Sequence, residues 1–201
     1  FYQFCFMRNI FVVSFFLLSG FVYAGDTLEI FKLDTTLVSN SILTNVVEPA
    51  NTQSLNIYEE RLRILDAKSP MDLAYNEKVQ PFIDSYLGRN KILISRMQGL
   101  KELYFPLFEQ QLDKYELPLE FKYLAIVESA LNPRAKSYSG ATGLWQFMYL
   151  TGKDYGLEVT SYTDERQDPL KSTQAACEYF LNLYDMFGDW NLVLAAYNGG
   201  P

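Results

Sequence analysis

The helical spacing of apolar residues is the feature that most constrains how this chain can fold. Apolar residues recur every three to four positions in residues 80–87, 100–108 and 170–184, which places them along one side of a helix. No segment shows the sustained alternation of apolar and polar residues that is typical of a half-buried strand. The sequence therefore predicts an all-α fold, irregular rather than a regular bundle, and it contains no internal repeat.

Capping residues and prolines indicate where these helices begin. Ser69 followed by Pro70 predicts the start of a helical segment, because serine is a preferred N-cap and proline is tolerated in the first turn. Asp168 followed by Pro169 predicts a second start on the same grounds. Asp189 is expected to cap a last helix. Residues 69–115 would then form an N-terminal helical segment.

The middle of the chain is expected to form further helices around a loop. Pro118 begins a helix that runs to about Leu131. Residues 137–143 are rich in glycine and serine, which predicts a loop. Residues 144–150 are expected to form a short helix, and residues 151–154 a capping box that opens another turn.

The first residues of the chain look like a secretion signal. Arg8 gives a positive start, residues 10–21 form an almost unbroken apolar run, and Ala24 completes a small-residue cleavage site. The run is too short for a comfortable transmembrane helix. We therefore expect residues 1–24 to be a pre-segment and signal peptide, and the protein to be exported to the periplasm or cell envelope. An uncleaved segment would anchor the chain instead, which leaves membrane association open.

The segment that follows, residues 25–68, is weakly patterned and rich in Asn, Thr, Ser and Val. Such a composition is typical of a linker or loosely ordered arm.

The composition excludes several classes of protein. The chain has no histidine, so it cannot form a Ser-His-Asp triad, a Cys-His pair or an HExxH zinc site. Its two cysteines, Cys5 and Cys177, form no CxxC pair. A net charge of −7 without a cluster of Lys and Arg argues against binding to nucleic acid. Any chemistry must come from carboxylates, hydroxyls and amides, and we expect neither a metal nor a cofactor.

Glu128 is the first candidate for that chemistry. On the predicted helix it lies within an arc of about 100° together with Phe121, Leu124 and Ala125. A carboxylate on an apolar face is desolvated, which raises its pKa toward the range that a general acid needs. A glutamate that caps a neighbouring helix or pairs with a buried arginine would leave the same pattern, so periodicity alone does not decide its role.

Two further stretches combine glycines with polar or aromatic residues. Residues 140–146 read Gly-Ala-Thr-Gly-Leu-Trp-Gln, and their glycines allow the backbone to approach a ligand. Trp145 is suited either to stack on a sugar or to fill the core, and Gln146 offers both a donor and an acceptor. Tyr197 and Asn198 place polar groups at a helix end, which a simple C-cap would also explain.

Taken together, these stretches resemble the lytic transglycosylase family of the goose-type lysozyme clan. The matching blocks, in order, are Glu128-Ser129, the Gly-x-x-Gly-Leu-Trp-Gln of residues 140–146, and the Ala-Tyr-Asn-x-Gly of residues 196–200. Residues 117–133 look especially like the membrane-bound lytic murein transglycosylase D group. The resemblance covers about residues 80–201. It implies an irregular lysozyme-like helical domain preceded by N-terminal helices.

The resemblance also implies roles for individual residues. Glu128 corresponds to the general acid and then base of the family, and Gln146 to a residue that contacts amide groups of the substrate. Tyr197 and Asn198 correspond to residues that line the cleavage subsite, and Ser129 to one that helps to position the site. The implied partner is the glycan strand of peptidoglycan. The implied reaction cleaves the β-1,4 bond between N-acetylmuramic acid and N-acetylglucosamine without water and leaves a 1,6-anhydromuramyl end.

The alternatives are a hydrolytic lysozyme and a non-catalytic peptidoglycan-binding module. A hydrolase needs a second carboxylate as nucleophile or as base for water. We expect Asp168 to be a helix cap and Asp164 and Glu165 to be solvated loop charges, so none of them fills that role.

The family continues beyond the Tyr-Asn motif with at least one more helix, and often with LysM wall-binding modules. We therefore expect residues 116–201 to be a catalytic domain that is truncated at its C-terminal end. The sequence does not indicate an oligomeric state.

Overall fold

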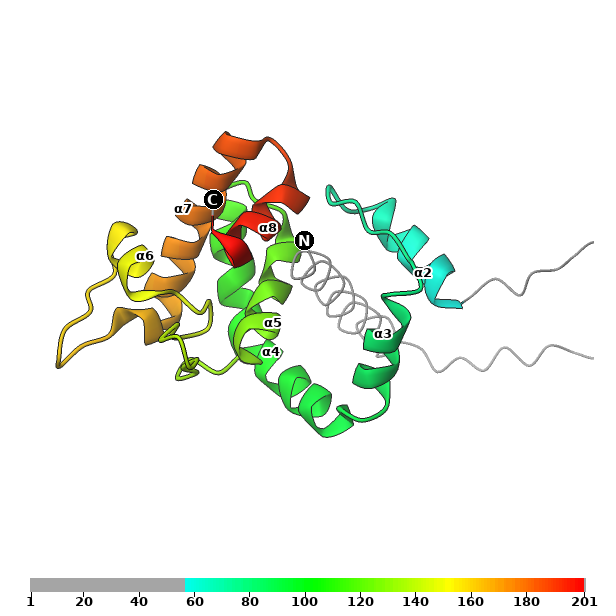
Figure 1. Ribbon diagram of the computed structural model, residues 1–201, viewed down its shortest axis with the longest axis horizontal. Helices are drawn as coiled ribbons and strands as arrows, with labels where there is room; N and C mark the ends of the chain where they lie inside the picture. The colour runs from blue at the N-terminus through cyan, green and yellow to red at the C-terminus, as the bar shows by residue number, and fades with distance from the viewer. Residues whose placement is uncertain (1–56, 201) are drawn as a thin grey trace, which may run out of the picture.

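The computed structural model describes residues 57–200, and these residues are mostly helical (Figure 1). The elements are α2 (Ile57–Asp66), α3 (Gln80–Leu87), α4 (Lys91–Lys114), η1 (Leu119–Tyr123), α5 (Leu124–Ser129), α6 (Tyr149–Asp154), η2 (Glu165–Gln167), α7 (Pro169–Phe187) and α8 (Trp190–Gly199), where η1 and η2 are 3-10 helices. Within residues 57–200, strand-like pairing is limited to isolated bridges. The prediction of an all-α fold is confirmed. The expected signal peptide and residues 25–56 of the expected arm lie outside the described residues.

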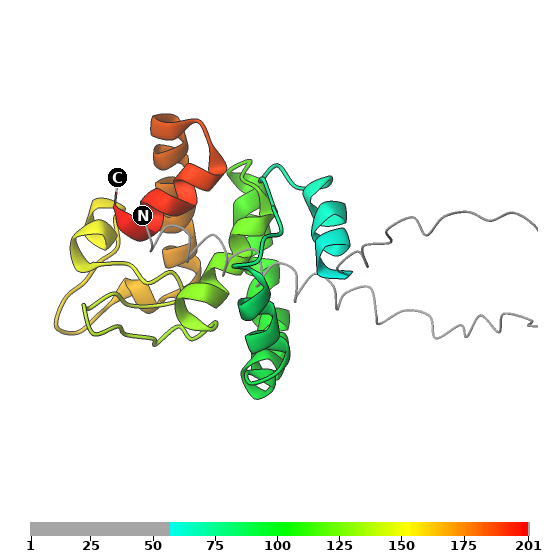
Figure 2. The same ribbon diagram turned by 45° about the vertical axis from the view of Figure 1, so that its right-hand side comes forward.

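Helix α4 forms the centre of the structure. Its Phe108 and Leu112 are fully buried, and the helix packs against both η1 and α7. Figure 2 shows α4 between the N-terminal helix α2 and the α7–α8 pair. Pro106 lies inside α4, yet the helix continues to Lys114. This long helix thus carries one core that extends from the N-terminal helices to the C-terminal ones.

Helices α7 and α8 begin where their capping residues predict. The Asp168 side chain accepts a 2.8 Å hydrogen bond from the Lys171 N–H, with Pro169 in the first turn of α7. The helix ends at Gly188, whose φ of 63° is left-handed and suits glycine. The Asp189 side chain then accepts a 2.9 Å hydrogen bond from the Leu192 N–H and starts α8. The two predicted starts at Asp168 and Asp189 are confirmed.

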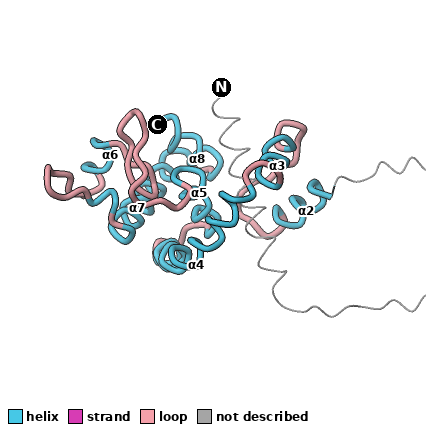
Figure 3. Tube along the Cα trace, turned by 90° about the horizontal axis from the view of Figure 1, so that it is seen from below, coloured by secondary structure: helices cyan, strands magenta, loops and turns pink. Residues whose placement is uncertain are grey.

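Residues 57–66 form helix α2, whereas we expected them to belong to a loosely ordered arm. Leu62 is only 1% exposed, and Tyr58 and Leu65 pack against the core. Figure 3 shows α2 next to α3. Residues 58, 62 and 65 have helical spacing. The segment was not predicted to be helical, because its few apolar residues lie among several Glu and Arg residues.

The Ser69-Pro70 pair does not begin a helix. Instead, the Ser69 hydroxyl accepts a hydrogen bond from the Met71 N–H, 3.1 Å away, and so stabilises a turn. Asp66 at the end of α2 accepts a 2.7 Å bond from the Leu73 N–H in the same connection. Short polar side chains stabilise such turns as readily as helix starts, because both present free N–H groups. The next helix, α3, begins ten residues later.

The short helix expected for residues 144–150 is also absent. Residues 143–146 form a turn, and the N–H groups of Thr142 and Phe147 each donate to the other's carbonyl at 3.0 and 3.1 Å. Gly143 has a φ of 90° and Gln146 a φ of 50°, and neither value is compatible with a right-handed helix. Helix α6 starts only after this turn. Thr151 lies inside it and does not cap it, so the predicted capping box is wrong.

Candidate active site

Glu128 lies at the last turn of α5 and lines an open pocket of about 430 Å³. Ser129 of the same helix, Lys136 and Ser137 of the following loop, and Gln146 also line this pocket. The pocket thus brings together the Glu-Ser block and the glutamine that the sequence placed eighteen residues apart from Glu128.

The local fold places Glu128 at the edge of the core. Phe121, Leu124 and Ala125 are all 0% exposed, and the Glu128 carboxyl at the end of this segment is itself desolvated by burial. The single helix expected from Pro118 to about Leu131 is replaced by η1 and α5, and α5 ends at Ser129. Ala130 and Leu131 have left-handed φ angles of 50° and 60°, so the helix ends directly after the site. Because non-glycine residues rarely adopt such angles, the surrounding contacts must hold this turn in place.

Burial raises the pKa of the Glu128 carboxyl to about 7. Within residues 57–200, the Glu128 side chain makes neither a hydrogen bond nor a salt bridge. The two alternatives for this residue, a cap for a neighbouring helix and a buried pair with arginine, therefore do not apply among the described residues. A half-buried carboxyl with a pKa near neutrality can give up a proton and take one back under physiological conditions.

Gln146 is held in a fixed orientation beside Glu128. Its Nε2 donates to the carbonyl of Gly143 at 2.9 Å and to that of Ala135 at 3.3 Å. These bonds occupy both N–H groups of the side-chain amide and leave Oε1 to accept a hydrogen bond from a ligand. The turn that carries Gln146 is thereby tied to the loop that follows α5.

A close approach of two backbones stabilises that turn. A Cβ atom on Gly143 would lie 1.8 Å from the carbonyl oxygen of Arg166, so only glycine fits there. Arg166 is 6% exposed, and its Nη1 donates to the carbonyls of Gly140 and Phe147, both at 3.2 Å. Asp164 balances the charge of this guanidinium at 2.7 Å. Arg166 thus holds both ends of the segment that presents Gln146.

Tyr197 and Asn198 of α8 line a second pocket of about 280 Å³, and Gln146 lines both pockets. The Tyr197 hydroxyl donates a 2.6 Å hydrogen bond to the main-chain carbonyl of Trp145. Burial raises the pKa of Tyr197 well above its ordinary range, and the charge of Glu128 raises it further. The Tyr-Asn pair thus lies at a pocket that shares Gln146 with the Glu128 pocket.

Comparison with known proteins assigns this part of the chain to a family. Residues 106–201 match the family model of the transglycosylase SLT domain. This stretch is therefore similar to an SLT domain, and it is called the SLT domain below. The match begins inside α4, before the boundary at residue 116 that we expected.

Several relatives resemble the chain over this region. The membrane-bound lytic murein transglycosylase D of Escherichia coli is 39% identical over 131 residues, which cover 65% of this chain and 29% of that protein. A putative tributyltin chloride resistance protein of an Alteromonas species is 34% identical over 100 residues, or 49% of this chain and 48% of that protein. The soluble lytic murein transglycosylase of Escherichia coli is 33% identical over 104 residues, or 49% of this chain and 16% of that protein. The chain thus spans less than a third of the length of transglycosylase D.

Trp145 of the SLT domain is a core residue. Its side chain is 0% exposed, and its Nε1 donates to the Thr173 hydroxyl at 2.9 Å. Its ring packs 5.1 Å from that of Phe108 and 5.8 Å from that of Phe180, measured between centroids. The interpretation of Trp145 as a sugar-stacking residue is wrong, because no part of the indole is accessible. Only its main-chain carbonyl takes part in the site.

Ser129 reaches the first pocket, but its hydroxyl is partly engaged. Its Oγ donates to the carbonyl of Ala125 at 2.9 Å, one turn earlier in α5. The oxygen can still accept a hydrogen bond from a ligand, since a hydroxyl also has lone pairs.

The later acids of the SLT domain have structural roles. Asp164 forms the ion pair with buried Arg166, which lowers the pKa of its carboxyl. Glu165 pairs with Lys171 and accepts a 2.8 Å hydrogen bond from the Glu158 N–H. The expectation that Asp164 and Glu165 are solvated loop charges is therefore wrong. Asp168 is the N-cap that the sequence predicted, and none of the three lines the Glu128 pocket.

Sequence reasoning missed part of the pocket wall. Tyr86 of α3 and Leu93 and Met97 of α4 also line the Glu128 pocket. Their apolar spacing is the same as that of ordinary core residues, so no sequence signal separates them from the core.

The described residues do not contain a cluster of three or more His, Cys, Asp or Glu side chains that could hold a metal ion. None of the helices within residues 57–200 is long and apolar enough to cross a membrane.

Proposed function

We propose that this chain is a peptidoglycan lytic transglycosylase with Glu128 as its general acid and then base. The observation that carries the proposal is the setting of Glu128: a carboxyl without a hydrogen-bond or ion-pair partner in the described residues, at an open pocket, with a pKa raised to about 7. The relatives named as murein transglycosylases support the assignment of substrate.

The proposed reaction needs one carboxyl group. Glu128 protonates the glycosidic oxygen that leaves from C1 of N-acetylmuramic acid, and the C1–O bond breaks. The C6 hydroxyl of the same sugar attacks C1, and the resulting carboxylate of Glu128 takes the hydroxyl proton. The products are a free 4-hydroxyl on N-acetylglucosamine and a 1,6-anhydromuramyl end, and water is not consumed.

The distribution of acids favours this route over hydrolysis. Among the described residues that line the two pockets, Glu128 is the only carboxylate. Most glycoside hydrolases need a second carboxylate, as nucleophile or as base for water. The C6 hydroxyl is tethered to the reacting ring, and tethering gives it a large effective concentration relative to water.

The other site residues bind and orient the sugar in this proposal. The free Oε1 of Gln146 accepts a hydrogen bond from an acetamido N–H of the substrate. Asn198 offers a side-chain amide from α8, and the Ser129 hydroxyl offers an acceptor beside Glu128. Peptidoglycan lies outside the cytoplasmic membrane, so the proposal includes export to the periplasm or cell envelope.

Digestion of purified sacculi in oxygen-18 water tests the reaction. The full-length enzyme should release anhydromuramyl fragments that carry no label. Label in most new muramyl ends would mean hydrolysis and a lysozyme-type enzyme, and the absence of any release would indicate a non-catalytic binding module.

Glu128→Gln tests the acid. The amide keeps the shape of the side chain but cannot donate the proton, so turnover should fall by at least about 10²- to 10⁴-fold. Glu158→Gln is the matched control, because Glu158 is exposed and lies outside both pockets. A Glu128→Gln enzyme that keeps more than about a tenth of the wild-type rate would refute the assignment.

A further inference from the structure

The pocket at Glu128 is not completed by the SLT domain alone. Tyr86 lies on α3 and Leu93 on α4, and both precede residue 106, where the SLT domain match begins. The C-terminal part of α4 belongs to the SLT domain, but its N-terminal part and α3 form a wall of the pocket that this domain does not supply.

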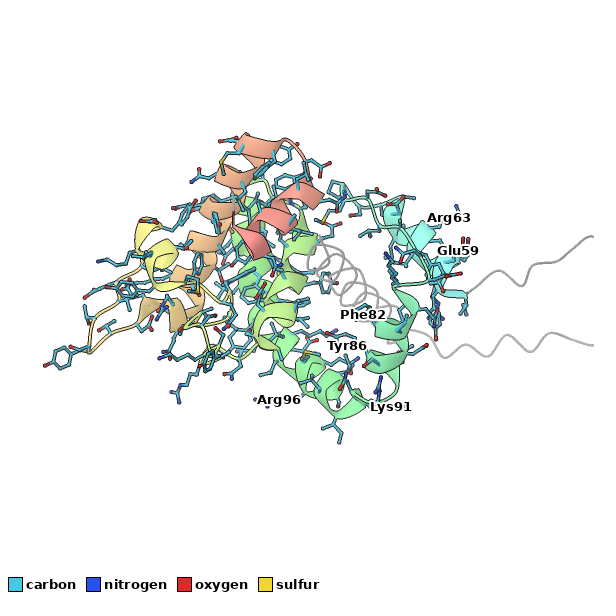
Figure 4. The ribbon with its side chains drawn as sticks, viewed as in Figure 1. Glu59, Arg63, Phe82, Tyr86, Lys91 and Arg96 are labelled. Carbon is cyan, nitrogen blue, oxygen red and sulfur yellow. The ribbon has the colours of Figure 1, made fainter. Side chains whose placement is uncertain are left out.

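Helix α3 holds Tyr86 in place at this wall. Ile83 is 0% exposed and anchors the helix, while Phe82 and Tyr86 are partly buried and pack against the core. Figure 4 shows Phe82 and Tyr86 on the side of α3 that faces the rest of the molecule. The tight connection to α4 is stabilised by Asn90, whose backbone N–H and side-chain Nδ2 both donate to Ser85, at 3.0 and 3.2 Å.

Leu93 adds an accessible apolar side chain to the same wall. Its side chain is 39% exposed although it lines the pocket, whereas Met97, one turn later, is 1% exposed. The wall thus consists of an aromatic ring, an accessible leucine and a buried methionine.

The rest of the lining comes from α5 and the loops that follow it. It combines the polar side chains of Glu128, Ser129, Lys136, Ser137 and Gln146 with the apolar ones of Ile126, Val127, Ala130 and Ala135. The pocket thus offers both apolar contact surface and hydrogen-bonding groups. A pyranose ring also has both kinds of surface. Its C–H groups form apolar faces, and its hydroxyl and acetamido groups lie around the rim. Small-molecule pockets commonly combine apolar contact surface with a few polar groups that fix orientation.

We propose that Tyr86 and Leu93 form a sugar-binding wall, which contacts the N-acetylated sugar held against Glu128. The substrate site then extends from the SLT domain onto α3 and the start of α4. This inference rests on the proposed function, since it names residues that bind the glycan of that reaction. Tyr86 and Leu93 act by contact with substrate and do not take part in proton transfer.

Binding can be measured without turnover in the full chain that carries Glu128→Gln. The probe is a hexasaccharide of β-1,4-linked N-acetylglucosamine, with its Kd measured by calorimetry. Adding Tyr86→Ala should weaken binding about tenfold or more, because an aromatic contact and its buried area are lost. Tyr86→Phe should keep the Kd within about threefold, since the ring remains.

Phe82→Ala is the matched control for the structural role of this helix. Phe82 lies one turn before Tyr86, packs against the same core and does not line the pocket. The Phe82→Ala substitution should lower the melting temperature. The Kd of the hexasaccharide should stay within about threefold of that of the Glu128→Gln parent. If Tyr86→Ala weakens binding no more than Phe82→Ala does, the proposed wall is wrong.

A second pair of variants avoids the buried core. Leu93→Gln should weaken binding about threefold or more, whereas Ile92→Gln should not, because Ile92 is 89% exposed and lies outside the pocket. Equal Kd values for these two proteins would also overturn the proposal.

The outcomes for the wall and for the reaction can be separated. If the wild-type enzyme releases no anhydromuramyl ends while Tyr86→Ala still weakens hexasaccharide binding, the proposed reaction fails and the sugar-binding wall stands. If anhydromuramyl ends appear and the Tyr86 and Leu93 variants bind as their parent does, the reaction stands and the wall fails.

Discussion

The hydroxyl of Tyr197 donates a hydrogen bond of 2.6 Å to the carbonyl of Trp145 and so joins α8 to the turn that carries Gln146. The Tyr197 ring packs between those of Tyr179 and Phe180, each 5.2 Å away between centroids. The phenol is protonated at neutral pH, and burial moves its pKa still further from neutrality. Tyr197 therefore acts on the site through the backbone next to Gln146 as well as through its position in the second pocket.

Replacing Tyr197 by Phe tests this connection. The change leaves the Trp145 carbonyl without that partner, which should lower the free energy of unfolding by about 1–3 kcal/mol. We expect kcat to fall about tenfold, because the Gln146 turn loses one of its supports. Tyr184→Phe removes the same hydroxyl from a residue outside both pockets and should change neither quantity. Wild-type stability and kcat in Tyr197→Phe would contradict the role of this bond.

The close approach of Gly143 to the Arg166 backbone can be tested by substitution, with Gly140 as the control position. Gly143→Ala should lower the free energy of unfolding by about 3 kcal/mol or more, because the new Cβ would lie 1.8 Å from the Arg166 carbonyl. Gly140 has the same φ of 90° but no neighbouring atom within 4 Å of such a Cβ, so Gly140→Ala should cost only about 1–2 kcal/mol. Urea unfolding of both proteins measures the difference, and equal losses would show that the close approach does not matter.

The raised pKa of Glu128 predicts how stability depends on pH. The folded protein binds this proton more tightly than the unfolded chain, so the contribution of Glu128 to stability is greatest below about pH 4.5 and is lost as pH rises through 7. Glu128→Gln removes this loss. The free energy of unfolding of the variant, relative to that of wild type, should therefore increase by on the order of 2 kcal/mol as the pH rises from about 5 to about 8. Urea unfolding at the two pH values measures the gain, and a difference that does not change with pH would contradict the shift.

The same shift predicts the pH dependence of activity. The reaction needs protonated Glu128 in the free enzyme, so kcat/KM should fall as pH rises above about 7. Initial rates of fragment release from sacculi between about pH 5 and about pH 9 test this. A decline centred near the ordinary pKa of a glutamic acid would mean that the carboxyl is not desolvated in the working enzyme.

The burial of Trp145 predicts a stability effect rather than a binding effect. Trp145→Phe leaves a cavity and removes the hydrogen bond to Thr173, so the free energy of unfolding should fall by about 2 kcal/mol or more. The KM for glycan should stay within about threefold of wild type, because the indole has no access to substrate. A stable variant with a strongly raised KM would restore the sugar-stacking interpretation.

Local signals were sufficient for several features of this protein. Asp168 and Asp189 cap helices because their side chains reach N–H groups three residues later, and that distance is the same in any fold. The burial of Phe121, Leu124 and Ala125 next to Glu128 agrees with their apolar spacing in the sequence. The same reasoning explains why the all-α fold and the position of Glu128 could be predicted from the sequence.

Local sequence patterns gave wrong predictions, or none, for other features of the fold. Ser69 lies in a turn rather than at a helix start, and Trp145 is buried against Phe108 and Phe180 from two other helices. The helix expected for residues 144–150 does not form before α6 begins at Tyr149, because Arg166 binds the carbonyls of Gly140 and Phe147 and holds the loop between them folded back.

The sequence by itself determined the all-α fold, the caps of α7 and α8 and the residue types available for chemistry. The tertiary structure decided which of those residues share a pocket, and it brought Tyr86 and Leu93 to the wall beside Glu128. The physical reason is one of range. Hydrogen bonds and steric preferences within a turn of helix are encoded by neighbours in the chain, whereas burial and its effect on the Glu128 carboxyl depend on segments that meet only when the chain is folded.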